Sequence, residues 1–585
     1  MSFTQTRWNF RQADPQQVRQ VAALYRINPV VAQILVQRGL TEPARIEKFL
    51  NPDLKRLTDP EGVPGIADAA KLIFEAVRQD RHIVIYSDYD VDGVCGLTLL
   101  AECIYLAGSR KIVPYIPHRI EEGYGINSEA VRNLAESYPG ALFISIDCGI
   151  TAVEPVALAR SMGLDVIVTD HHSFKAELPA ANVLVHPRLP GSDPACENLC
   201  GAGVAFKLAW QVAKHFGDGQ KASPQMRDYL MRTMGLVALA TVADVMPLVD
   251  ENRILVKHGV NALNTRRSVG LDYLLQMSGV RPDRPVTSGT IGFQIAPRIN
   301  AAGRMMHANK AFELLYTRTK EDAIRLVEEL EEINRQRKEI ELSITNAARS
   351  QFETDPKAAE RHVVVLAEQG WHPGVIGIVA SRMVDTYHRP SIVLSIDEKG
   401  VAHGSGRSIS GINLVEVLQV CSSLLKTFGG HAAAAGLKLD AKNIDEFREM
   451  FDSEVAKRQP GELGQKELWI DVELEVSQLT VDLVRAIEEL EPYGQGNQRP
   501  LFAASGLELT GQPMLMGQQK NHVRLNLKQN NRLLKVVAWG QAELAERLEK
   551  GKRYDVAFTP EVNQWEDRVE VQGVLKAIRE SEWKC

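Results

Sequence analysis

The sequence predicts a multidomain α/β protein. Three observations support this class: a length of 585 residues, which corresponds to about four domains at roughly 150 residues each, apolar strands that alternate with helices over residues 66–268, and a strand-dominated C-terminal part. With 44% hydrophobic residues, each domain can bury a core, and the 24% of charged residues exclude wholesale disorder. The predicted order is a helical segment (1–65), an α/β domain (66–268), a helical connector with one long helix (269–353), a smaller α/β domain (354–460) and a strand-rich barrel (466–585).

Five short runs rich in valine and isoleucine predict the strands of the first α/β domain. They are residues 82–86, 111–116, 141–146, 165–169 and 182–185. A helical stretch over 225–242 closes the domain. Strands that alternate with helices in this way predict a parallel sheet covered on both faces.

Residues 318–350 predict a single long helix, because apolar residues recur there every three or four positions within a highly charged sequence. At 1.5 Å per residue, about 30 residues span roughly 45 Å, so a domain boundary lies here. The run HVVVLAEQG (362–370) then opens a second α/β unit, and RQPGELGQKE (458–467) resembles a linker.

The C-terminal part shows the period-2 pattern of strands. In HVRLNLK (522–528), polar residues alternate strictly with apolar ones, QNN (529–531) supplies a hairpin turn, and RLLKVVAW (532–539) begins the return strand. A small antiparallel barrel is the expected architecture.

Composition excludes several classes of protein. The formal charge of −6 neither demands nor forbids a nucleic-acid partner, so a polyanion site requires a local excess of positive charge. The first residues lack the apolar core of a signal peptide, and no apolar run reaches the ~18 residues of a membrane helix. We therefore expect a cytoplasmic protein without a membrane partner. The cysteines number seven, and Cys196 and Cys200 have no second pair, which argues against a disulfide framework or a zinc finger.

Three predicted strands of the first α/β domain run into acidic residues. The first leads to Asp88, Asp90 and Asp92, another to Asp147, and a third to Asp170, His171 and His172. Ligands of open α/β sheets bind beyond the carboxyl ends of the strands, so these side chains should converge. Asp244 lies in an otherwise apolar helical run, where a carboxylate is costly to bury unless it is paired or binds a cation.

Clustered carboxylates repel one another and take up protons unless divalent cations neutralise them. A mixed aspartate and histidine shell suits Mn²⁺ and also Mg²⁺. Two such ions roughly 3.5–4 Å apart would activate a water and clamp the leaving oxygen of a phosphoester. A single aspartate after a strand is more often a helix cap or a turn residue. A Rossmann enzyme also has an acid at such a position, but no GxGxxG follows the first strand, which argues against that fold. The combination predicts a metal site.

The same residues carry a resemblance. SDYDVDG (87–93), SIDCG (145–149), TDHH (169–172) and the helix of Asp244 resemble, in order, the four motifs of the DHH phosphoesterase superfamily. Within it, five further segments resemble the RecJ family of single-strand-specific exonucleases: 117–125, 297–305, 370–383, 405–408 and 428–436. The resemblance covers essentially the whole chain. It implies a DHH catalytic domain, a DHHA1 domain and an OB-like domain.

The resemblance also implies roles for the clustered residues. The implied metal ligands are Asp90, Asp92, Asp147, His171 and Asp244, with Asp147 as the bridge between two ions. His172 would lie against the scissile phosphate, and Asp88 and Asp147 would be the other catalytic groups. Pyrophosphatase-like relatives have a histidine where this chain has Tyr86, so Asp88 is either a ligand in that space or a group behind the ligands.

Other residues would hold the DNA strand. The implied set is Arg119, Arg298, Asn300, Arg304, Arg407, Ser408, Gly429, Gly430 and His431. Arg407 and Ser408 offer a guanidinium fork and a hydroxyl to a terminal phosphate, and the two glycines let backbone approach a phosphate closely. An isolated Arg-Ser pair is more often plain surface, and the glycines could equally form a tight turn before an alanine-rich helix.

The barrel gives an independent signal. Residues 518–540 contain five lysines and arginines and no acid. Lys520, Arg524 and Lys528 share parity, which predicts one basic strand face, and Trp539 and Trp565 are possible base platforms. The alternative is a solvated strand face with ordinary core tryptophans.

The resemblance implies a 5′-to-3′ exonuclease that hydrolyses single-stranded DNA to 5′-mononucleotides with two Mn²⁺ or Mg²⁺ ions, in recombination and repair. The implied partners are single-stranded DNA, single-strand-binding protein and other repair proteins, and we expect a monomer. One alternative is a phosphodiesterase of cyclic dinucleotides or short oligonucleotides, but such relatives lack the basic barrel. The other is a non-catalytic scaffold, which the complete set of acids and histidines argues against.

Overall fold

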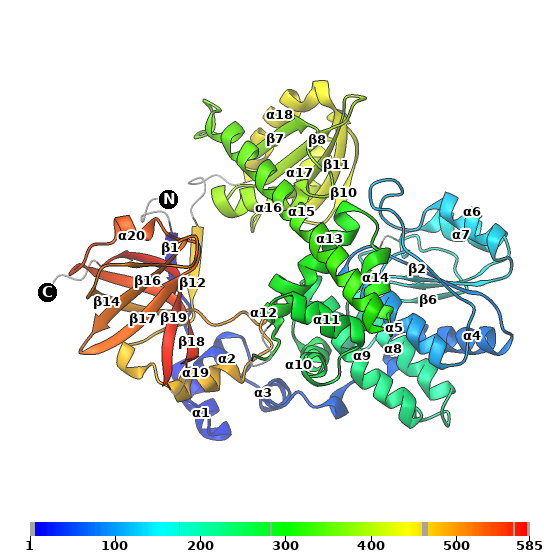
Figure 1. The fold of residues 1–585 in the computed structure, drawn as a ribbon, viewed down its shortest axis with the longest axis horizontal. Coiled ribbons are helices and arrows are strands. Elements are labelled where there is room, and N and C mark those ends of the chain that lie inside the picture. The colour runs from blue at the N-terminus through cyan, green and yellow to red at the C-terminus, as the bar shows by residue number, and fades with distance from the viewer. Residues whose placement is uncertain (1–5, 175, 281–283, 459–465, 566–567, 582–585) are drawn as a thin grey trace. The chain divides into compact units, whose positions relative to one another are not determined.

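The structure is a computed structural model that describes the chain apart from residues 1–5, 175, 281–283, 459–465, 566–567 and 582–585. The described residues form two compact units (Figure 1). Unit 1 comprises Met1–Pro52, Gln465–Tyr493 and Asn497–Cys585, and unit 2 comprises Asp53–Gly464 and Gly494–Gly496. The predicted linker over 458–467 lies mostly outside the described residues. Within the part that is described, no helix has the length and apolarity needed to cross a membrane.

The first α/β domain of unit 2 contains the predicted parallel sheet. Its five strands lie in the order β3-β2-β4-β5-β6, and every pairing is parallel. Their bounds are β2 (Ile83–Ser87), β3 (Ile112–Tyr115), β4 (Leu142–Ile146), β5 (Asp165–Thr169) and β6 (Val183–Val185). Each of the five predicted runs is therefore confirmed as a strand.

Helices cover both faces of this sheet. Ile83 and Ile85 belong to the core formed with α4 (Ile66–Arg78), α5 (Val91–Leu106), α8 (Gly201–His215) and α9 (Pro224–Ala243). Val84 and Tyr86 point to the opposite core, formed with α6 (Ser128–Ser137) and α7 (Val153–Ser161). Because both faces are buried, the polar groups at the carboxyl edge of the sheet are left available to a ligand.

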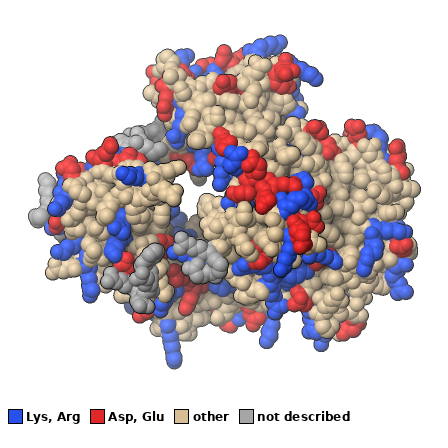
Figure 2. All heavy atoms as spheres, viewed as in Figure 1, with Lys and Arg blue, Asp and Glu red and all other residues tan. Residues whose placement is uncertain are grey.

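A helical connector follows. It comprises α10 (Asp250–Thr265), α11 (Val269–Met277), α12 (Ser288–Thr290), the π-helical turn η4 (Ile291–Ile295), α13 (Ala296–Met305), α14 (Asn309–Tyr316) and α15 (Lys320–Glu353). The predicted long helix is confirmed as α15. Acidic and basic side chains alternate on its exposed face (Figure 2), with pairs such as Arg325–Glu329 at 2.8 Å. Arg337, which interrupts the apolar stripe, is buried because it pairs with Glu341 and Asn334.

The smaller α/β domain of unit 2 has a mixed sheet in the order β10-β11-β9-β8-β7. Its strands are β7 (Val364–Gln369), β8 (Ser391–Ile396), β9 (Val401–Arg407), β10 (Leu425–Gly430) and β11 (Ala434–Asp440), and its helices are α16 (Ile376–Tyr387), α17 (Leu414–Val420) and α18 (Ile444–Arg458). Only β7 and β8 pair in parallel. Ile344 and Phe352 of α15 pack into the core that contains α16, so the long helix joins the two domains of unit 2.

Unit 1 contains the predicted barrel, but the barrel is not wholly antiparallel, because β17 pairs with β19 and β13 with β14 in parallel. Its strands lie in the order β13-β14-β18-β19-β17-β16-β15, and an additional β14–β16 pairing closes the sheet. The strands are β13 (Val472–Glu473), β14 (Phe502–Leu509), β15 (Met514–Met516), β16 (His522–Gln529), β17 (Arg532–Ala538), β18 (Arg553–Trp565) and β19 (Arg568–Glu580), with helices α19 (Val481–Glu488) and α20 (Leu544–Arg547). Asn530 and Asn531 both have positive φ, 45° and 64°, as a tight hairpin turn between β16 and β17 requires.

The N-terminal residues differ from the prediction of one helical segment over 1–65. Three helices form, α1 (Pro15–Tyr25), α2 (Pro29–Gln37) and α3 (Pro43–Leu50), but β1 (Thr6–Phe10) precedes them and pairs in parallel with β12 (Lys466–Ile470). Ile34 and Leu35 of α2 are fully buried in the core that also holds the barrel residues. Residues 1–52 therefore belong with the barrel, because pairing between segments distant in sequence is invisible to local periodicity.

Candidate active site

The predicted acids and histidines meet at the carboxyl edge of the parallel sheet. Asp147 follows β4, His171 follows β5, and Asp244 lies directly after the last residue of α9. The Nε2 atom of His171 lies 3.1 Å from Oδ1 of Asp147, 3.6 Å from Oδ2 of Asp92 and 3.7 Å from Oδ2 of Asp244. The convergence expected from the sequence is confirmed.

The N-termini of two helices hold the carboxylates of Asp90 and Asp92. Oδ1 of Asp90 accepts hydrogen bonds from the backbone N–H groups of Asp92 and Gly93, at 2.9 and 3.2 Å, and so caps α5. The buried carboxylate of Asp92 accepts from the N–H groups of Gly201 and Ala202, both at 2.7 Å, in the first turn of α8. Asp92 is thus fixed by a second helix whose positive end faces it.

Asp147 occupies a crowded position. Its φ of 62° lies in the left-handed region, which aspartate tolerates better than most residues. A Cβ atom at Gly201 would lie only 2.6 Å from the Cβ and Oδ1 atoms of Asp147. The glycine therefore lets α8 approach this carboxylate closely.

The cluster contains groups suited to divalent cations. In three combinations the ligand atoms lie within 4.8 Å of one another: Asp92 with His171 and Asp244, Asp88 with Asp90 and Asp147, and Asp147 with His171 and His172. Oδ1 of Asp88, Oδ1 of Asp147 and both ring nitrogens of His171 are buried and have no hydrogen-bond partner among the described residues. Buried polar atoms without partners are costly, so bound cations would account for this donor set.

The electrostatics agree with that requirement. Burial, followed by the charges of Asp92 and Asp90, raises the pKa of Asp147 well above its usual range and that of Asp244 to about 8. Burial, and to a smaller extent the negative charge of Asp90, also raises the pKa of Asp88 well above its usual range. The raised pKa values favour the protonated form of these carboxyl groups unless cations compensate their charge. Burial lowers the pKa of His171 to about 4, which keeps its imidazole in the neutral form that binds metals.

His172 has a different environment. Its Nδ1–H donates to Oδ1 of Asp170 at 2.7 Å, and the Tyr124 hydroxyl lies 3.2 Å from the same nitrogen. Although burial favours the neutral ring, this hydrogen bond and the charge of Asp170 raise the pKa of His172 to about 9. Burial alone would raise the pKa of Asp170, but the hydrogen bond with His172 outweighs this effect and lowers the pKa to about 2. His172 is therefore an oriented cation at neutral pH, and sequence reasoning did not identify Asp170 and Tyr124 as the groups that contact it.

Tyr86 takes no part in this cluster. Its hydroxyl donates to the carbonyl of Gly125 at 3.0 Å, and its ring lies in the core on the opposite face of the sheet. Asp88, by contrast, lies within ligand reach of Asp90 and Asp147.

Three arginines from separate segments of unit 2 form an arginine cluster: Arg119, Arg304 and Arg407. Nη1 of Arg304 donates to the carbonyl of Gly374 at 3.2 Å, and the Arg119 guanidinium lies 4.8 Å from the ring centre of Tyr89. Burial, followed by the charges of Arg119 and Arg407, lowers the pKa of Arg304 to about 10. Guanidinium groups that converge in this way form a site for an anion.

Ser408 differs from its expected role beside Arg407. Its hydroxyl donates to the carbonyl of Ile412 at 2.8 Å and so stabilises a turn. The hydroxyl that contacts Arg407 Nη1, at 3.1 Å, belongs to Ser405. Both Ser405 and Arg407 lie on β9, where residues two apart share a face, and this parity could have identified Ser405 from the sequence.

Arg298 and Asn300 also have structural partners. The Arg298 guanidinium forms a bidentate pair with Glu331, at 2.6 and 3.2 Å, and thereby fastens α13 to α15. Its donors are engaged within the protein, and its expected role in binding DNA stays a prediction. Oδ1 of Asn300 accepts from the N–H of Val91 at 3.2 Å, which places α13 beside the start of α5.

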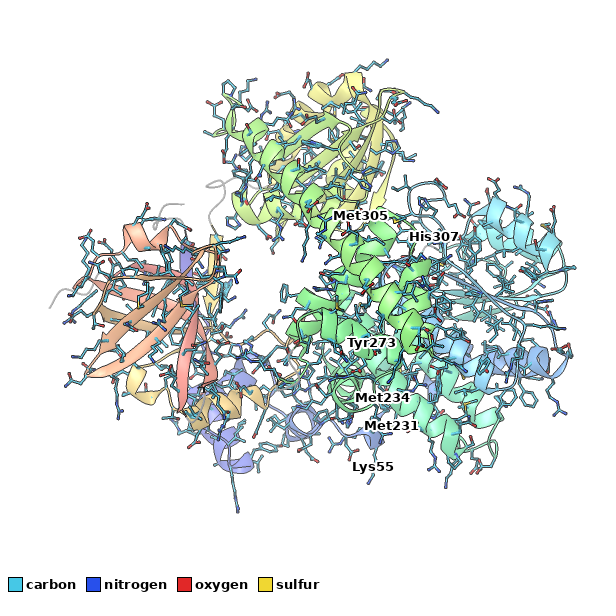
Figure 3. All side chains as sticks on the ribbon, in the orientation of Figure 1. Lys55, Met231, Met234, Tyr273, Met305 and His307 are labelled. Atoms are coloured by element: carbon cyan, nitrogen blue, oxygen red, sulfur yellow. The ribbon has the colours of Figure 1, made fainter. Side chains whose placement is uncertain are left out.

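The end of α13 is a junction within unit 2. Met305 packs against the core of the smaller α/β domain, and the His307 ring lies 5.9 Å from that of His118 in the motif 117–125 (Figure 3). The helix therefore connects the arginine cluster, the smaller domain and the segment 88–92, which we call the acidic motif.

Gly429, Gly430 and His431 lie at the hairpin between β10 and β11. A Cβ atom at Gly430, whose φ is 143°, would lie 2.4 Å from the carbonyl oxygen of Ala434, whereas one at Gly429 would meet nothing within 4 Å. His431 is exposed. A strand follows the turn, so the alternative of an alanine-rich helix is wrong.

The basic face of the barrel is smaller than predicted. Arg524 and Lys528 lie on the outer face of β16, but Lys520 has a φ of 51° in the turn before the strand, so the parity argument does not reach it. Trp539 is half exposed and meets His522 edge-on at 4.8 Å. The side chain of Trp565 lies outside the described part of the structure.

The fold and the site define a protein of the DHH class, with acids and histidines at the edge of a parallel sheet. Matching family models agree: the DHH family N-terminal domain at residues 82–241, the DHHA1 domain at 360–457 and the RecJ OB domain at 470–577. Curated relatives include the single-stranded-DNA-specific exonuclease RecJ of Bacillus subtilis (34% identity, 100% of this chain and 72% of the relative) and that of Escherichia coli (31%, 81% and 83%). The crystal structure of RecJ from Thermus thermophilus in complex with Mn²⁺ is similar, with a TM-score of 0.82, 31% identity and coverage of 99% of this chain and 80% of the other. The chain belongs to the RecJ family.

Proposed function

We propose that the chain is a single-stranded-DNA-specific exonuclease that degrades its substrate from the 5′ end and releases 5′-mononucleotides, in DNA recombination and repair. The observation that carries this proposal is the arginine cluster close to the acidic cluster. A Cβ atom at Gly303, the residue before Arg304, would lie 2.6 Å from the carbonyl oxygen of Tyr89, the residue before Asp90. The names of the relatives support the substrate.

Two divalent cations, Mn²⁺ or Mg²⁺, fit the donor set. Asp92, His171 and Asp244 would hold one, Asp88 and Asp90 would contribute to the other, and Asp147 would bridge them. Bound ions would supply positive charge for the phosphodiester and a hydroxide nucleophile at neutral pH.

The chain's own residues supply orientation and proton handling. Because Nδ1 of His172 is held by Asp170, Nε2–H remains for an oxygen of the scissile phosphate, whose developing charge it stabilises. Asp170 is a positioning residue that fixes the ring. Arg119, Arg304 and Arg407, with Ser405 beside them, would grip a 5′-terminal phosphate. A terminal phosphate bound next to the scissile one sets the polarity and the release of single nucleotides.

Other groups would hold the rest of the strand. On unit 1, Lys520, Arg524 and Lys528 would contact phosphates, and Trp539 would stack on a base. The hairpin of Gly429, Gly430 and His431 offers open backbone and an exposed imidazole to a phosphate. We further infer a cytoplasmic monomer that works with single-strand-binding protein and other repair proteins, which co-purification and light scattering would test.

Digestion of labelled DNA tests the proposal. Single strands labelled at either end, blunt duplexes, 5′-phosphorylated dinucleotides and cyclic dinucleotides are incubated with and without Mn²⁺. We expect mononucleotides from the 5′ end of single strands only in the presence of the metal, little from duplexes, and a strongly reduced yield with Asp147→Asn. Hydrolysis of cyclic dinucleotides without hydrolysis of long strands would contradict the proposal.

A further inference from the structure

An exposed aromatic side chain lies close to the end of α9, the helix that Asp244 follows. Phe293 is 87% exposed, the largest fraction among the exposed large hydrophobic side chains in the described residues. It belongs to η4, a π-helical turn between α12 and α13. Turns of this kind are rare and occur frequently at functional sites.

A second exposed apolar residue ends α9 in an unusual way. The N–H of Val245 donates to the carbonyl of Val242 and that of Met246 to Thr241, at 3.2 and 3.0 Å, which is the hydrogen-bond pattern of a Schellman cap. Glycine is the usual residue at the left-handed position of this cap, but here it is Val245, with a φ of 57°. For a β-branched residue this φ is an outlier.

Core packing does not explain the choice of valine. The Val245 side chain is 65% exposed, so the residue pays a conformational cost without burying its methyl groups. Strained backbone of this kind clusters at ligand sites. A ligand that contacts the side chain would explain why glycine is not used.

The two residues belong to the same edge of unit 2. A Cβ atom at Gly292 would lie 3.8 Å from Cγ1 of Val242, so η4 packs against the last turn of α9. Phe293 follows Gly292, and Val245 comes three residues after Val242. We call Phe293 and Val245 the apolar ledge.

The order of groups along η4 and α13 places the ledge relative to the reaction. Asn300 contacts Val91 beside Asp90, and Arg304 belongs to the arginine cluster. At 1.5 Å per residue, Phe293 lies ~10 Å before Asn300 along the helix, and Arg304 lies ~6 Å beyond it. The ledge and the arginine cluster are thus on opposite sides of the acidic motif.

We propose that the apolar ledge is a subsite for a nucleobase of the strand on the 3′ side of the scissile phosphodiester, beyond the first nucleotide on that side, with the base stacked on Phe293 and in contact with Val245. The inference rests on the proposed function, because a 5′-phosphate at the arginine cluster directs the remaining strand toward the ledge. Stacking on an aromatic ring accepts any base, as an exonuclease without sequence preference requires. Phe293 lies on the same run of helical turns as Asn300 and Arg304, and this position beside a phosphodiester site favours a nucleobase as the occupant over a second copy of the chain.

Substitutions of Phe293 test the subsite directly. Binding of a 12-nucleotide single strand is measured by fluorescence anisotropy in chelator, on the Asp147→Asn background, so that no cleavage interferes. Phe293→Ala should weaken binding about 5- to 150-fold, the range that one stacked base corresponds to. Phe293→Trp should restore binding and Phe293→Leu should not. Leu342→Ala, which removes an exposed apolar side chain from α15, is the matched control and should have no effect.

Val245→Gly separates a ligand contact from a structural role. Glycine adopts the left-handed conformation without strain, so the urea midpoint of unfolding should rise while strand binding weakens. A structural role would move stability and binding in the same direction. Unchanged binding by Val245→Gly would remove this residue from the subsite.

Substrate length separates the subsite from the chemistry. A 5′-phosphorylated dinucleotide should not reach the ledge, so Phe293→Ala should hydrolyse it at the unaltered rate while its KM for long strands increases. Abasic positions near the 5′ end of the strand should weaken strand binding by the unaltered protein more than they weaken strand binding by Phe293→Ala.

The outcomes distinguish the two proposals. A protein that releases no nucleotides from any single strand contradicts the proposed function. If the protein is active but Phe293→Ala binds the single strand as tightly as Leu342→Ala does, the subsite alone is contradicted. Equal losses on dinucleotides and long strands, or a changed oligomeric state in Phe293→Ala, would also overturn the subsite, because the ring would then serve folding or a second copy of the chain.

Discussion

Nε2 of His171 and Oδ1 of Asp147 lie 3.1 Å apart, and neither atom has a hydrogen-bond partner among the described residues. Two buried polar atoms at this distance without a hydrogen bond are explained by a cation that both could bind. His171 reaches Asp92 and Asp244 on one side, and Asp147 reaches Asp88 and Asp90 on the other. The pair therefore joins two potential cation sites into one centre.

Asp147→Asn should lower the rate of hydrolysis by at least about 10²-fold, because replacing even a group that only hydrogen-bonds a metal ligand typically costs 10- to 100-fold, and Asp147 would itself bind both ions. Asparagine tolerates the left-handed φ of this position, so the thermal midpoint should stay near that of the unaltered chain. Strand binding in chelator should persist. Near-normal turnover would refute the ligand assignment.

Divalent ions should stabilise the protein more as the pH rises. The pKa of Asp244 is raised to about 8, so without metal its contribution to stability is full at acidic pH and is lost as the pH rises through 8. The thermal midpoint of unfolding in chelator should therefore be lower at pH 9 than at pH 6. Mn²⁺, which needs the ionised form, should raise the midpoint most at pH 9. Asp244→Asn removes the titrating group and serves as the control. A Mn²⁺ effect independent of pH would contradict the account.

Gly201→Ala should damage the site through overpacking. The added methyl group would lie 2.6 Å from Asp147, and forced insertions of this size cost about 1–3 kcal/mol in the free energy of unfolding. Activity should fall further than stability, because Asp147 and the Asp92 hydrogen bond are displaced together. Gly203→Ala on the same helix, where the nearest atom is a leucine methyl group at 3.2 Å, is the milder control. Equal activities of the two variants would show that the close approach is unimportant.

The response to the 5′-terminal phosphate should depend on Arg407 and Ser405. Arg407→Lys and Ser405→Ala should reduce the preference for 5′-phosphorylated over 5′-hydroxyl strands, with about a tenfold loss for the arginine, since one charged hydrogen bond contributes about 1.5–3 kcal/mol. Ser408→Ala should keep the preference, because its hydroxyl bonds to Ile412. Competition between the two strands measures the preference directly. The reverse order of effects would restore Ser408 as the phosphate ligand.

The basic residues of the barrel should govern the salt dependence of strand binding. Replacing Lys520, Arg524 and Lys528 with alanine should reduce the slope of log K against log salt by about 2, at about 0.7 per phosphate contact. Lys535→Ala with Lys552→Ala is the control, since both ammonium groups are paired with glutamates. An unchanged slope in the triple variant would show that these residues do not contact the strand.

Much of this architecture is predictable from the sequence because it is local. The five parallel strands, the long helix and the hairpin at Asn530 and Asn531 follow from residue patterns within short windows. The convergence of Asp92, Asp147 and His171 follows from one rule, that the carboxyl ends of parallel strands share an edge.

The remainder depends on contacts between segments distant in sequence. No periodicity shows that β1 pairs with β12, or that the Arg298 guanidinium is engaged by Glu331. The role of Ser405 was within reach, because strand parity alone places it beside Arg407. The strained cap at Val245 is visible only in three dimensions, since a valine after a helix has no distinctive pattern.

Anomalous diffraction from crystals soaked in Mn²⁺ tests the central claim most directly. The account predicts two manganese peaks, one bound by Asp92, His171 and Asp244, the other by Asp88 and Asp90, with Asp147 contacting both. Crystals in which this cluster carries no manganese peak at saturating metal, or carries only one, would contradict it.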